Sequence, residues 1–399
     1  MLQCKTKWTS KTIENCCDIL DSKRIPINEE ERDSLKGNIP YYGANGLQGY
    51  INDYIFDDDL ILLAEDGGYF DEYETRPIAY KISGKSWVNN HAHILKPKNS
   101  YNFNYVFYNL EHKNILYYIN GGTRAKLTQE ELKKIRINII DDYDMQSKIA
   151  DILSTCDEVI EKTEETIEKY KQIKAGMMQD LFTRGLDENG KLRPTYAQNP
   201  DLYKYSKLLD RYIPTEWEAD KLDNLFTYTV GGDVDKPCFS EYKTSLHKYP
   251  IFANAVDNEG LYGYSSKFVI DSPAITIAGR GVNVGTVFYR DAFFTPIVRL
   301  VVVFPNECLN ILFASIALSR IKFESEATGI PQLTVPMVKK YKMAYPKNKE
   351  EQQNIYKYLH KIDLKLEKEE QYLNKYKQIK QGLMKRLLTP PADAEIVEE

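Results

Sequence analysis

The sequence predicts an α+β protein with a pseudo-twofold internal repeat: two similar globular α/β units separated by two long α-helices that form an antiparallel coiled coil. Three observations predict this fold. A nine-residue motif recurs about half a chain length later, the segments that end in it have coiled-coil periodicity, and the other segments contain short strands and glycine turns. A chain of 399 residues is long enough for two or three domains with sizeable cores.

The repeat extends well beyond the motif. Residues 170–178 read YKQIKAGMM and residues 376–384 read YKQIKQGLM, an offset of 206 positions (376 − 170). Nearer the N-terminus the register drifts, where Trp8 matches Trp217 and residues 39–50 resemble residues 249–264. Because a repeat of this period makes two copies of one unit, any function is expected to use two similar surfaces. The offset of 206 also relates Leu127 to Leu333, Thr128 to Thr334, Gln146 to Gln352, Asp157 to Asp363 and Thr183 to Thr389.

Two long helices are predicted over residues 145–183 and 345–388. Their apolar residues recur with alternating spacings of four and three, which is typical of a coiled-coil seam. A narrow seam needs a partner, and the chain must return from the first helix to begin a second unit. Antiparallel pairing is therefore favoured over packing of each helix on its own globular unit. The predicted seam contains Ile149, Leu153, Ile160, Ile167, Tyr170, Met177 and Leu181 in the first helix, and Ile355, Leu359, Ile362, Leu366, Leu373, Tyr376, Leu383 and Leu387 in the second.

The globular units are assigned to residues 1–144 and 213–344. Residues 60–64 and 274–278 have the composition of buried strands followed by glycine turns, and short helices are expected at residues 103–118 and 309–319. Residues 184–212 contain an Asp-Glu-Asn-Gly turn and prolines, which indicates a linker. Residues 389–399 are predicted to be a disordered acidic tail, with four acids and no base from Pro391 onward.

The bulk properties restrict the class of protein. The net charge of −5 argues weakly against a surface that binds polyanions all over, although local patches matter more than the sum. Six cysteines without a CxxC pair, and no signal peptide, favour a reduced cytoplasmic location. The most apolar stretch, residues 297–318, is interrupted by Arg299 and by Pro305-Asn306-Glu307. Its last part, residues 311–318, is too short to span a bilayer, so no membrane partner is expected.

Motifs that would indicate catalysis, a cofactor or a metal site are missing. Ser83-Gly84-Lys85-Ser86 resembles the end of a phosphate-binding loop, but Ala79 stands where the upstream glycine is required. His91 and His93 could supply two metal ligands without a third. The sequence contains neither the Asn-Pro-Pro-aromatic element of an amino-methyltransferase nor a glycine-rich cofactor loop. No catalytic residue, cofactor or metal is therefore assigned, and a binding protein is favoured.

The order of these segments resembles the specificity subunit of type I restriction–modification enzymes. Two half-sequence repeats, each a globular unit followed by a helix that ends in Tyr-Lys-Gln-Ile-Lys-x-Gly-hydrophobic-Met, carry the resemblance. It covers nearly the whole chain. Two departures are the run before each helix, which is not proline-rich, and the Glu-Gln that opens the second helix at Glu351-Gln352 but reads Met145-Gln146 in the first. Further matching segments are 87–95, 122–124, 187–190 and 213–217.

The resemblance implies that each globular unit is a target recognition domain that reads one half of a bipartite, asymmetric site in double-stranded DNA. It also implies that the helices set the spacing and dock two methyltransferase (modification) subunits and, through them, restriction/translocase subunits. Methylation and cleavage then belong to those partners, and this chain has no catalysis of its own.

Candidate DNA-binding residues follow from the chemistry of base recognition. Arginine and lysine pair with guanine in the major groove, and asparagine and glutamine pair with adenine. The candidates in the first unit are Tyr42, Asn45, Gln48, Lys85, Asn89, Arg124 and Lys126, and those in the second are Asn254, Asn258, Arg280, Asn283, Arg290 and Gln332.

Two other functions remain open from the sequence. One is a stand-alone DNA nuclease or methyltransferase with an unrecognised site, for which Asp57-Asp58-Asp59 with Glu65 and Asp66 is the only candidate acidic cluster. The other is a coiled-coil scaffold that does not bind DNA.

Overall fold

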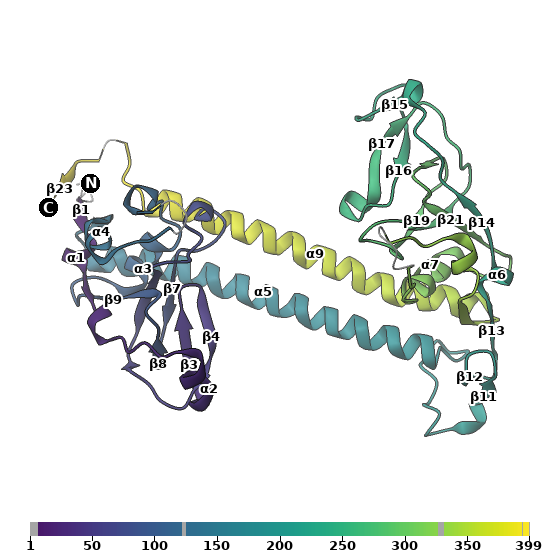
Figure 1. Ribbon diagram of the computed structural model, residues 1–399, viewed down its shortest axis with the longest axis horizontal. Helices are drawn as coiled ribbons and strands as arrows, with labels where there is room; N and C mark the ends of the chain where they lie inside the picture. The colour runs from purple at the N-terminus through teal and green to yellow at the C-terminus, as the bar shows by residue number, and fades with distance from the viewer. Residues whose placement is uncertain (1–6, 122–124, 326–330, 393, 399) are drawn as a thin grey trace, which may run out of the picture. The chain divides into compact units, whose positions relative to one another are not determined.

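The computed structural model describes residues 7–121, 125–325, 331–392 and 394–398, and Figure 1 shows the course of the chain. The chain divides into two compact units. Unit 1 comprises residues 1–165 and 370–399, and unit 2 comprises residues 166–369. Each unit therefore contains one globular portion together with parts of both long helices, α5 (Tyr143–Thr183) and α9 (Lys349–Leu387).

Unit 1 contains two four-stranded sheets and a smaller one. Their strand orders are β2-β9-β6-β7, β4-β3-β8-β5 and β10-β1-β23. The strands are β1 (Trp8–Thr12), β2 (Cys17–Ile19), β3 (Lys36–Gly43), β4 (Gly46–Ile51), β5 (Phe56–Asp57), β6 (Leu60–Ala64), β7 (Ala79–Ile82), β8 (Lys85–Val88), β9 (Ala92–Pro97), β10 (Arg136–Ile140) and β23 (Ile396–Glu398). The short helices are α1 (Ile13–Cys16), α2 (Glu29–Ser34), α3 (Phe103–Glu111) and α4 (Gln129–Lys134).

Unit 2 contains two four-stranded sheets and two strand pairs. The orders are β14-β21-β18-β19, β15-β17-β16-β20, β13-β22 and β11-β12. The strands are β11 (Tyr203–Ser206), β12 (Arg211–Pro214), β13 (Trp217–Lys221), β14 (Phe226–Val230), β15 (Phe239–Ser240), β16 (Tyr249–Phe252), β17 (Leu261–Ser265), β18 (Ala274–Ile277), β19 (Val287–Arg290), β20 (Thr295–Pro296), β21 (Val301–Pro305) and β22 (Lys342–Pro346). The short helices are α6 (Leu222–Leu225), α7 (Ile311–Ser319) and α8 (Val335–Val338).

The two globular portions share one topology. The sheet β2-β9-β6-β7 corresponds strand for strand to β14-β21-β18-β19, with antiparallel neighbours throughout. The group β4-β3-β8 corresponds to β17-β16-β20, and both groups combine one antiparallel with one parallel pairing. The central strands β6 and β18 are entirely buried, which explains why β6 is apolar throughout and β18 is apolar except for Thr276. The duplication predicted from the sequence is thus a duplication of fold.

Each globular core is closed by the start of one long helix and the end of the other. In unit 1, Ile149 and Leu153 from the start of α5 belong to the main core, and Leu383 and Leu387 from the end of α9 pack against it. In unit 2, Ile355 and Leu359 from the start of α9 share a core with the end of α5. The helices therefore pack on globular portions as well as on each other, so the two modes of packing weighed from the sequence both occur.

Ion pairs within each unit show that the helices run antiparallel. In unit 1, Lys380 Nζ lies 2.6 Å from Asp157 Oδ1, and Lys377 Nζ lies 2.7 Å from Glu164 Oε1. A higher position on α5 thus pairs with a lower position on α9. In unit 2, Lys174 of α5 forms an ion pair with Asp363 of α9. The predicted fold class is confirmed.

The least exposed line along each helix coincides with the predicted seam. Ile149, Leu153, Ile167 and Leu181 of α5 are buried, and the other seam residues of this helix are half-buried. In α9, Ile355 and Leu359 are buried and the remaining seam residues are half-buried. Thr163 interrupts the apolar pattern, but its hydroxyl donates to the Val159 carbonyl one turn earlier, so its burial leaves no polar group unsatisfied.

The C-terminal tail differs from its prediction. Ile396–Glu398 form strand β23, which pairs in parallel with Trp8–Ser10 of β1, so the prediction of a disordered tail is wrong for these residues. The acidic composition concealed two adjacent apolar, β-branched residues, Ile396 and Val397, which favour pairing with an open strand edge.

The described residues include no helix that is both long and apolar enough to cross a membrane.

Candidate nucleic-acid interface

The same two loops meet in each unit beside the central buried strand. In unit 1 the loop after β6 and the loop before α4 form an isolated antiparallel bridge between Asp66 and Lys126. In unit 2 the equivalent bridge joins Arg280 to Gln332. A further backbone bond matches as well, because Leu127 N donates to Glu65 O over 2.8 Å and Leu333 N donates to Gly279 O over 2.9 Å. Two strictly corresponding loop clusters therefore exist, with different residues at the bridge.

An asparagine ties a third segment to each cluster. In unit 1, Asn45 lies in the turn between β3 and β4, and its Nδ2 donates to Gly67 O over 2.9 Å. In unit 2, Asn254 Oδ1 accepts from Gly279 N at 2.8 Å, and Asn254 Nδ2 donates to Val298 O at 2.6 Å. Both candidate asparagines therefore position loops. In Asn254, both Oδ1 and Nδ2 form hydrogen bonds within the protein.

Three candidates of unit 1 are connected by hydrogen bonds, and Asn45 and Lys126 lie at the loop cluster. Gln48 Oε1 accepts from Asn89 Nδ2 at 3.1 Å, and Asn89 N donates to the Tyr42 carbonyl over 2.9 Å. Asn89 is buried, whereas Gln48 is exposed and Tyr42 is half-buried. Lys126 is exposed at the bridge.

One further candidate of unit 1 lies apart from these residues, and another cannot be placed. Lys85 lies on β8, opposite Asp57 of β5, with its ammonium over the Tyr54 ring. Arg124 lies outside the described residues.

The candidates of unit 2 divide into two groups. Arg280, Asn283 and Gln332 lie together around the β18–β19 loop, where Gly281 N donates to Pro331 O and Thr286 N to Asn283 O. Asn258 and Arg290 form a separate group. The Arg290 guanidinium is buried between the Phe252 and Phe288 rings, 3.8 and 4.7 Å from their centroids.

Arg290 lines an open cavity of about 400 Å³ together with Phe252, Glu259 and Phe288. Arg290 Nη2 donates to the Glu259 carbonyl over 2.5 Å, and Nε donates to Thr276 Oγ1 over 3.1 Å. Asn258 and Glu259 have left-handed backbone angles, with φ of 48° and 52°. Arg290 therefore holds a strained turn in place, and burial lowers the pKa of its guanidinium.

Arg299 is a cluster residue that the sequence analysis did not select. It is exposed, its N–H donates to Gly231 O, and both it and Val298 have left-handed φ angles of 58° and 53°. A positive φ is unusual for a β-branched residue and concentrates at functional sites. The sequence signal for Arg299 is its position inside an otherwise apolar stretch.

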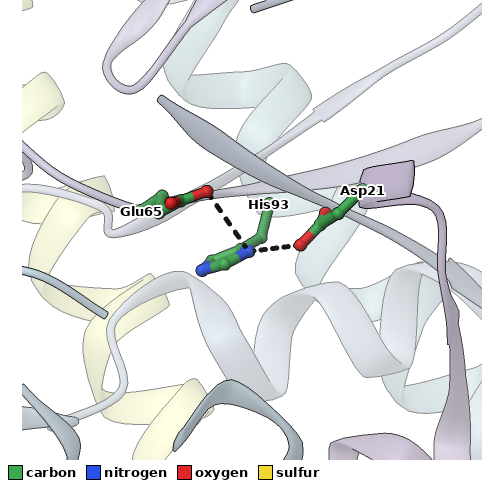
Figure 2. A group of neighbouring side chains, drawn as sticks. All are labelled: Asp21, Glu65 and His93. Carbon is green, nitrogen blue, oxygen red and sulfur yellow. Dashed lines mark hydrogen bonds and ion pairs between the residues drawn. The ribbon is translucent and has the colours of Figure 1, made fainter. Parts of the chain in front are cut away.

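A network of charged side chains contacts the loop cluster of unit 1. Figure 2 shows Asp21, Glu65 and His93 pointing toward one another. His93 Nδ1 lies 2.6 Å from Asp21 Oδ2, and His93 Nε2 lies 2.9 Å from the Leu127 carbonyl. Glu65 Oε2 accepts from Arg24 Nη1 at 2.7 Å, and Glu65 Oε1 lies 3.0 Å from Lys126 Nζ. The network thereby connects the buried strands to the exposed Lys126 loop.

Neighbouring donors lower the pKa of both carboxyl groups in this network. Burial alone would raise the pKa of Asp21, but the hydrogen bond and charge of His93, the Ile94 N–H and Arg24 hold it below its usual range. For Glu65 the same burial effect is outweighed by hydrogen bonds from Arg24 and Lys126. Both groups are therefore held as carboxylates.

These three residues are the only group of potential metal ligands among the described residues, with ligand atoms within 4.8 Å of one another. The arrangement does not suit a metal ion. Both nitrogens of His93 are already directed at acceptors, and the cations Arg24 and Lys126 occupy the Glu65 oxygens. The cluster is better explained as a buried ion network than as a catalytic centre.

Comparison with known proteins identifies the family. The sequence matches the Type I restriction modification DNA specificity domain over residues 5–172 and again over residues 214–378. The chain belongs to this family.

Relatives and solved structures agree with this assignment. A type I specificity subunit of Mycoplasma pneumoniae is 28% identical over 347 residues, covering 86% of this chain and 85% of that protein. A type I restriction enzyme specificity subunit of Haemophilus influenzae is 34% identical over 149 residues, 37% of each chain. The crystal structure of the type I restriction-modification S subunit from M. genitalium has a similar fold, with a TM-score of 0.67, 18% identity, and coverage of 98% of this chain and 99% of that one.

The resemblance inferred from the sequence is confirmed. The chain is a DNA specificity subunit of a type I restriction–modification system and not a catalytic subunit. Three of the five acids in the candidate nuclease cluster bind other side chains of the protein. Asp58 forms an ion pair with Lys96, Glu65 forms ion pairs with Arg24 and Lys126, and His91 Nδ1 lies 2.7 Å from Asp66 Oδ1.

Proposed function

We propose that each globular portion is a target recognition domain that reads one half of a bipartite, asymmetric DNA site. The first domain comprises residues 1–144 and the second residues 213–344, with residues 184–212 as the linker. The helices over residues 145–183 and 345–388 set the spacing between the two half-sites. They also dock two modification subunits and, through them, restriction/translocase subunits, which carry out methylation and cleavage.

One observation carries this proposal: corresponding loop clusters occur in two segments that both match a DNA specificity domain. The positions correspond, but the residues differ, since Asp66 and Lys126 in unit 1 stand where Arg280 and Gln332 stand in unit 2. Because base recognition depends on the donors and acceptors presented to a groove, different residues on equivalent loops favour two different half-sites.

Burial and hydrogen bonds within the protein reduce the number of candidate DNA-binding residues. Exposed or half-buried candidates at the loop clusters remain, and Arg299 joins them. Asn89 and Arg290 are buried with their polar groups bonded inside the protein, so we assign them positioning roles. The proposed contacts are Tyr42, Asn45, Gln48 and Lys126 for one half-site, and Asn254, Arg280, Asn283, Arg299 and Gln332 for the other. Arg124 stays a candidate on the sequence alone, and Lys85 and Asn258 lie apart from the proposed contacts.

Mapping methylated adenines in the host genome, with and without this gene, tests the proposal. The expected result is a two-part asymmetric motif with an unread gap that disappears with the gene. A short continuous palindrome would contradict two separate readers.

A variant tests the assignment of one reader. Arg299→Ala should weaken binding of the complex to its full site about 10-fold, because one arginine contact to a base contributes roughly 1–3 kcal/mol. If the contact is to a phosphate, the salt dependence of binding should instead fall by about one unit of slope. Arg211→Ala, an exposed arginine on β12, is the matched control and should leave binding unchanged. Equal loss in both variants would contradict a specific role for Arg299.

A further inference from the structure

The duplicated helices carry a matched pair of ion pairs. Asp157 and Lys174 of α5 correspond to Asp363 and Lys380 of α9 at the repeat offset of 206 (363 − 157 and 380 − 174). In unit 1, Lys380 pairs with Asp157, and in unit 2, Lys174 pairs with Asp363. The two sites are therefore copies of one arrangement, and each can be compared with the other.

In unit 1 a second carboxylate completes the site. Lys380 Nζ lies 2.8 Å from both Oε1 and Oε2 of Glu111, the last residue of α3. The side chains of Lys380 and Glu111 are only 12% and 11% exposed. Tyr108, one turn earlier on α3, donates its hydroxyl to Asp157 Oδ2 over 2.6 Å. The site is thus closed by side chains of unit 1 itself.

In unit 2 the corresponding helix lacks this carboxylate. α3 and α7 correspond because each begins after an asparagine whose N–H donates to the glutamine of a long helix, Asn102 to Gln146 at 2.8 Å and Asn310 to Gln352 at 2.6 Å. Glu111 is nine residues beyond Asn102, and the residue nine beyond Asn310 is Ser319. The place of the glutamate is taken by a serine.

A cavity of about 200 Å³ lies at that place in unit 2. Its lining includes Lys174, Asp363 and Ser319, together with the apolar side chains of Met178 and Ile316. The Lys174 side chain is 34% exposed, about three times the value for Lys380. An ammonium group has three N–H donors, so Lys174 can bond a second carboxylate beside Asp363, as Lys380 does in unit 1.

We propose that this cavity, the Lys174 cavity, receives an aspartate or glutamate side chain of the modification subunit. The inference rests on the proposed function, in which that subunit docks on the helices. The carboxylate would bond Lys174 as Glu111 bonds Lys380, and the apolar wall of Met178 and Ile316 would contact its methylene groups. DNA fits the cavity less well, because a phosphate has no methylene groups to pack against the apolar wall of Met178 and Ile316. The carboxylate enters a cavity that unit 1 fills internally, so the two docking surfaces are not equivalent.

Two substitutions test the inference in the full-length chain. Ser319→Glu supplies an internal carboxylate at the position of Glu111, and Lys174→Gln removes the cation. Each should weaken binding of the purified modification subunit about 10-fold or more, the effect of losing one charge-assisted bond. Isothermal titration calorimetry gives the affinity, and thermal unfolding monitors folding of each variant.

Matched controls separate this site from general effects. Ser319→Ala leaves the cavity open, and Lys171→Gln removes an exposed charge from the same helix. Both should bind within about twofold of the unsubstituted chain. If Ser319→Glu and Lys174→Gln also bind within twofold, the inference is overturned while the proposed function stands. If the unsubstituted chain does not bind the modification subunit at all, the proposed function fails, and the inference fails with it.

Discussion

Glu351, at the start of α9, is expected to contribute about 3 kcal/mol to the stability of unit 2. Its Oε1 accepts from Leu186 N at 2.8 Å, Trp217 Nε1 at 2.9 Å and Arg193 Nη1 at 2.6 Å. Its Oε2 accepts from Arg193 Nη2 at 3.0 Å. The side chains of Glu351 and Arg193 are 6% and 7% exposed, so a single carboxylate joins the linker, β13 and α9 in a nearly dry site.

The substitution Glu351→Gln isolates the charge. Glutamine keeps the volume and one carbonyl oxygen, but its NH₂ group faces the Arg193 guanidinium, so donor meets donor. Removing one partner of a buried ion pair costs roughly 3–5 kcal/mol. The lower value applies because Arg193 keeps two acceptors, Glu216 and the Arg184 carbonyl. Burial alone would lower the pKa of Arg193, but Glu351 and Glu216 raise it. Arg193 stays charged in the variant because Glu216 remains beside it and a guanidinium keeps its proton in proteins.

Hydrogen exchange read by mass spectrometry resolves the effect by segment. Amides around Leu186 and Trp217 should lose protection by about 100-fold, the equivalent of 3 kcal/mol, whereas amides of unit 1 should exchange as before. Glu350→Gln, on the exposed neighbouring residue, is the control and should change protection by less than about 0.5 kcal/mol. A loss below about 1 kcal/mol at Leu186, or an equal loss throughout unit 1, would refute the reasoning.

Two further predictions concern the helices and the charged network. Ile160→Asp, or the matching Leu366→Asp, should weaken helix pairing by about 2 kcal/mol through burial of a charge in the seam. Either substitution should abolish full-site binding in a DNA shift assay, while the circular dichroism signal of the sheets persists. Ile152→Asp, at an exposed position, is the control. Unchanged affinity, or an equal loss in the control, would contradict the prediction. Asp21 and Glu65 have lowered pKa values in the folded state, so their contribution to stability is complete above their ordinary values of 3.8 and 4.5 and is lost as pH falls through the folded values. Urea midpoints between pH 6 and 3 should fall less in Asp21→Asn than in the unsubstituted chain, and parallel curves would exclude the network as a cause.

The elements that depend on local periodicity could be predicted from the sequence. The heptad spacing of α5 and α9 specified which residues face a partner, because helical side chains three and four positions apart share one face. The repeat of Gln146 and Gln352 also has a local meaning. In both units the glutamine joins the N-cap asparagine of a short helix to the carbonyl of the strand preceding its own helix, through Ile140 in unit 1 and Pro346 in unit 2.

The candidate site was harder to predict because it depends on contacts between distant segments. His93 contacts Asp21, which lies 72 positions earlier in the sequence, and no spacing pattern predicts such a pair. Asn89 has the chemistry of a base-reading residue, yet its burial follows from strand pairing that the sequence does not specify. Arg299 was missed for the opposite reason, since its exposure results from a left-handed turn at a position where neither residue is glycine.

The two copies differ near the residue at which each long helix begins. Met145 corresponds to Glu351 at the repeat offset (351 − 145 = 206), and it is exposed at the surface of unit 1. Unit 2 needs the carboxylate because a linker enters there, and Arg193 of that linker must be neutralised where it is buried. In unit 1 an edge of β1 is covered instead by β23. The equivalent region is thus stabilised by an ion pair in unit 2 and by strand pairing in unit 1. A chimera that exchanged Met145 and Glu351 would therefore leave a carboxylate in unit 1 without its arginine and an arginine in unit 2 without its carboxylate, and it should lose stability in unit 2 far more than in unit 1.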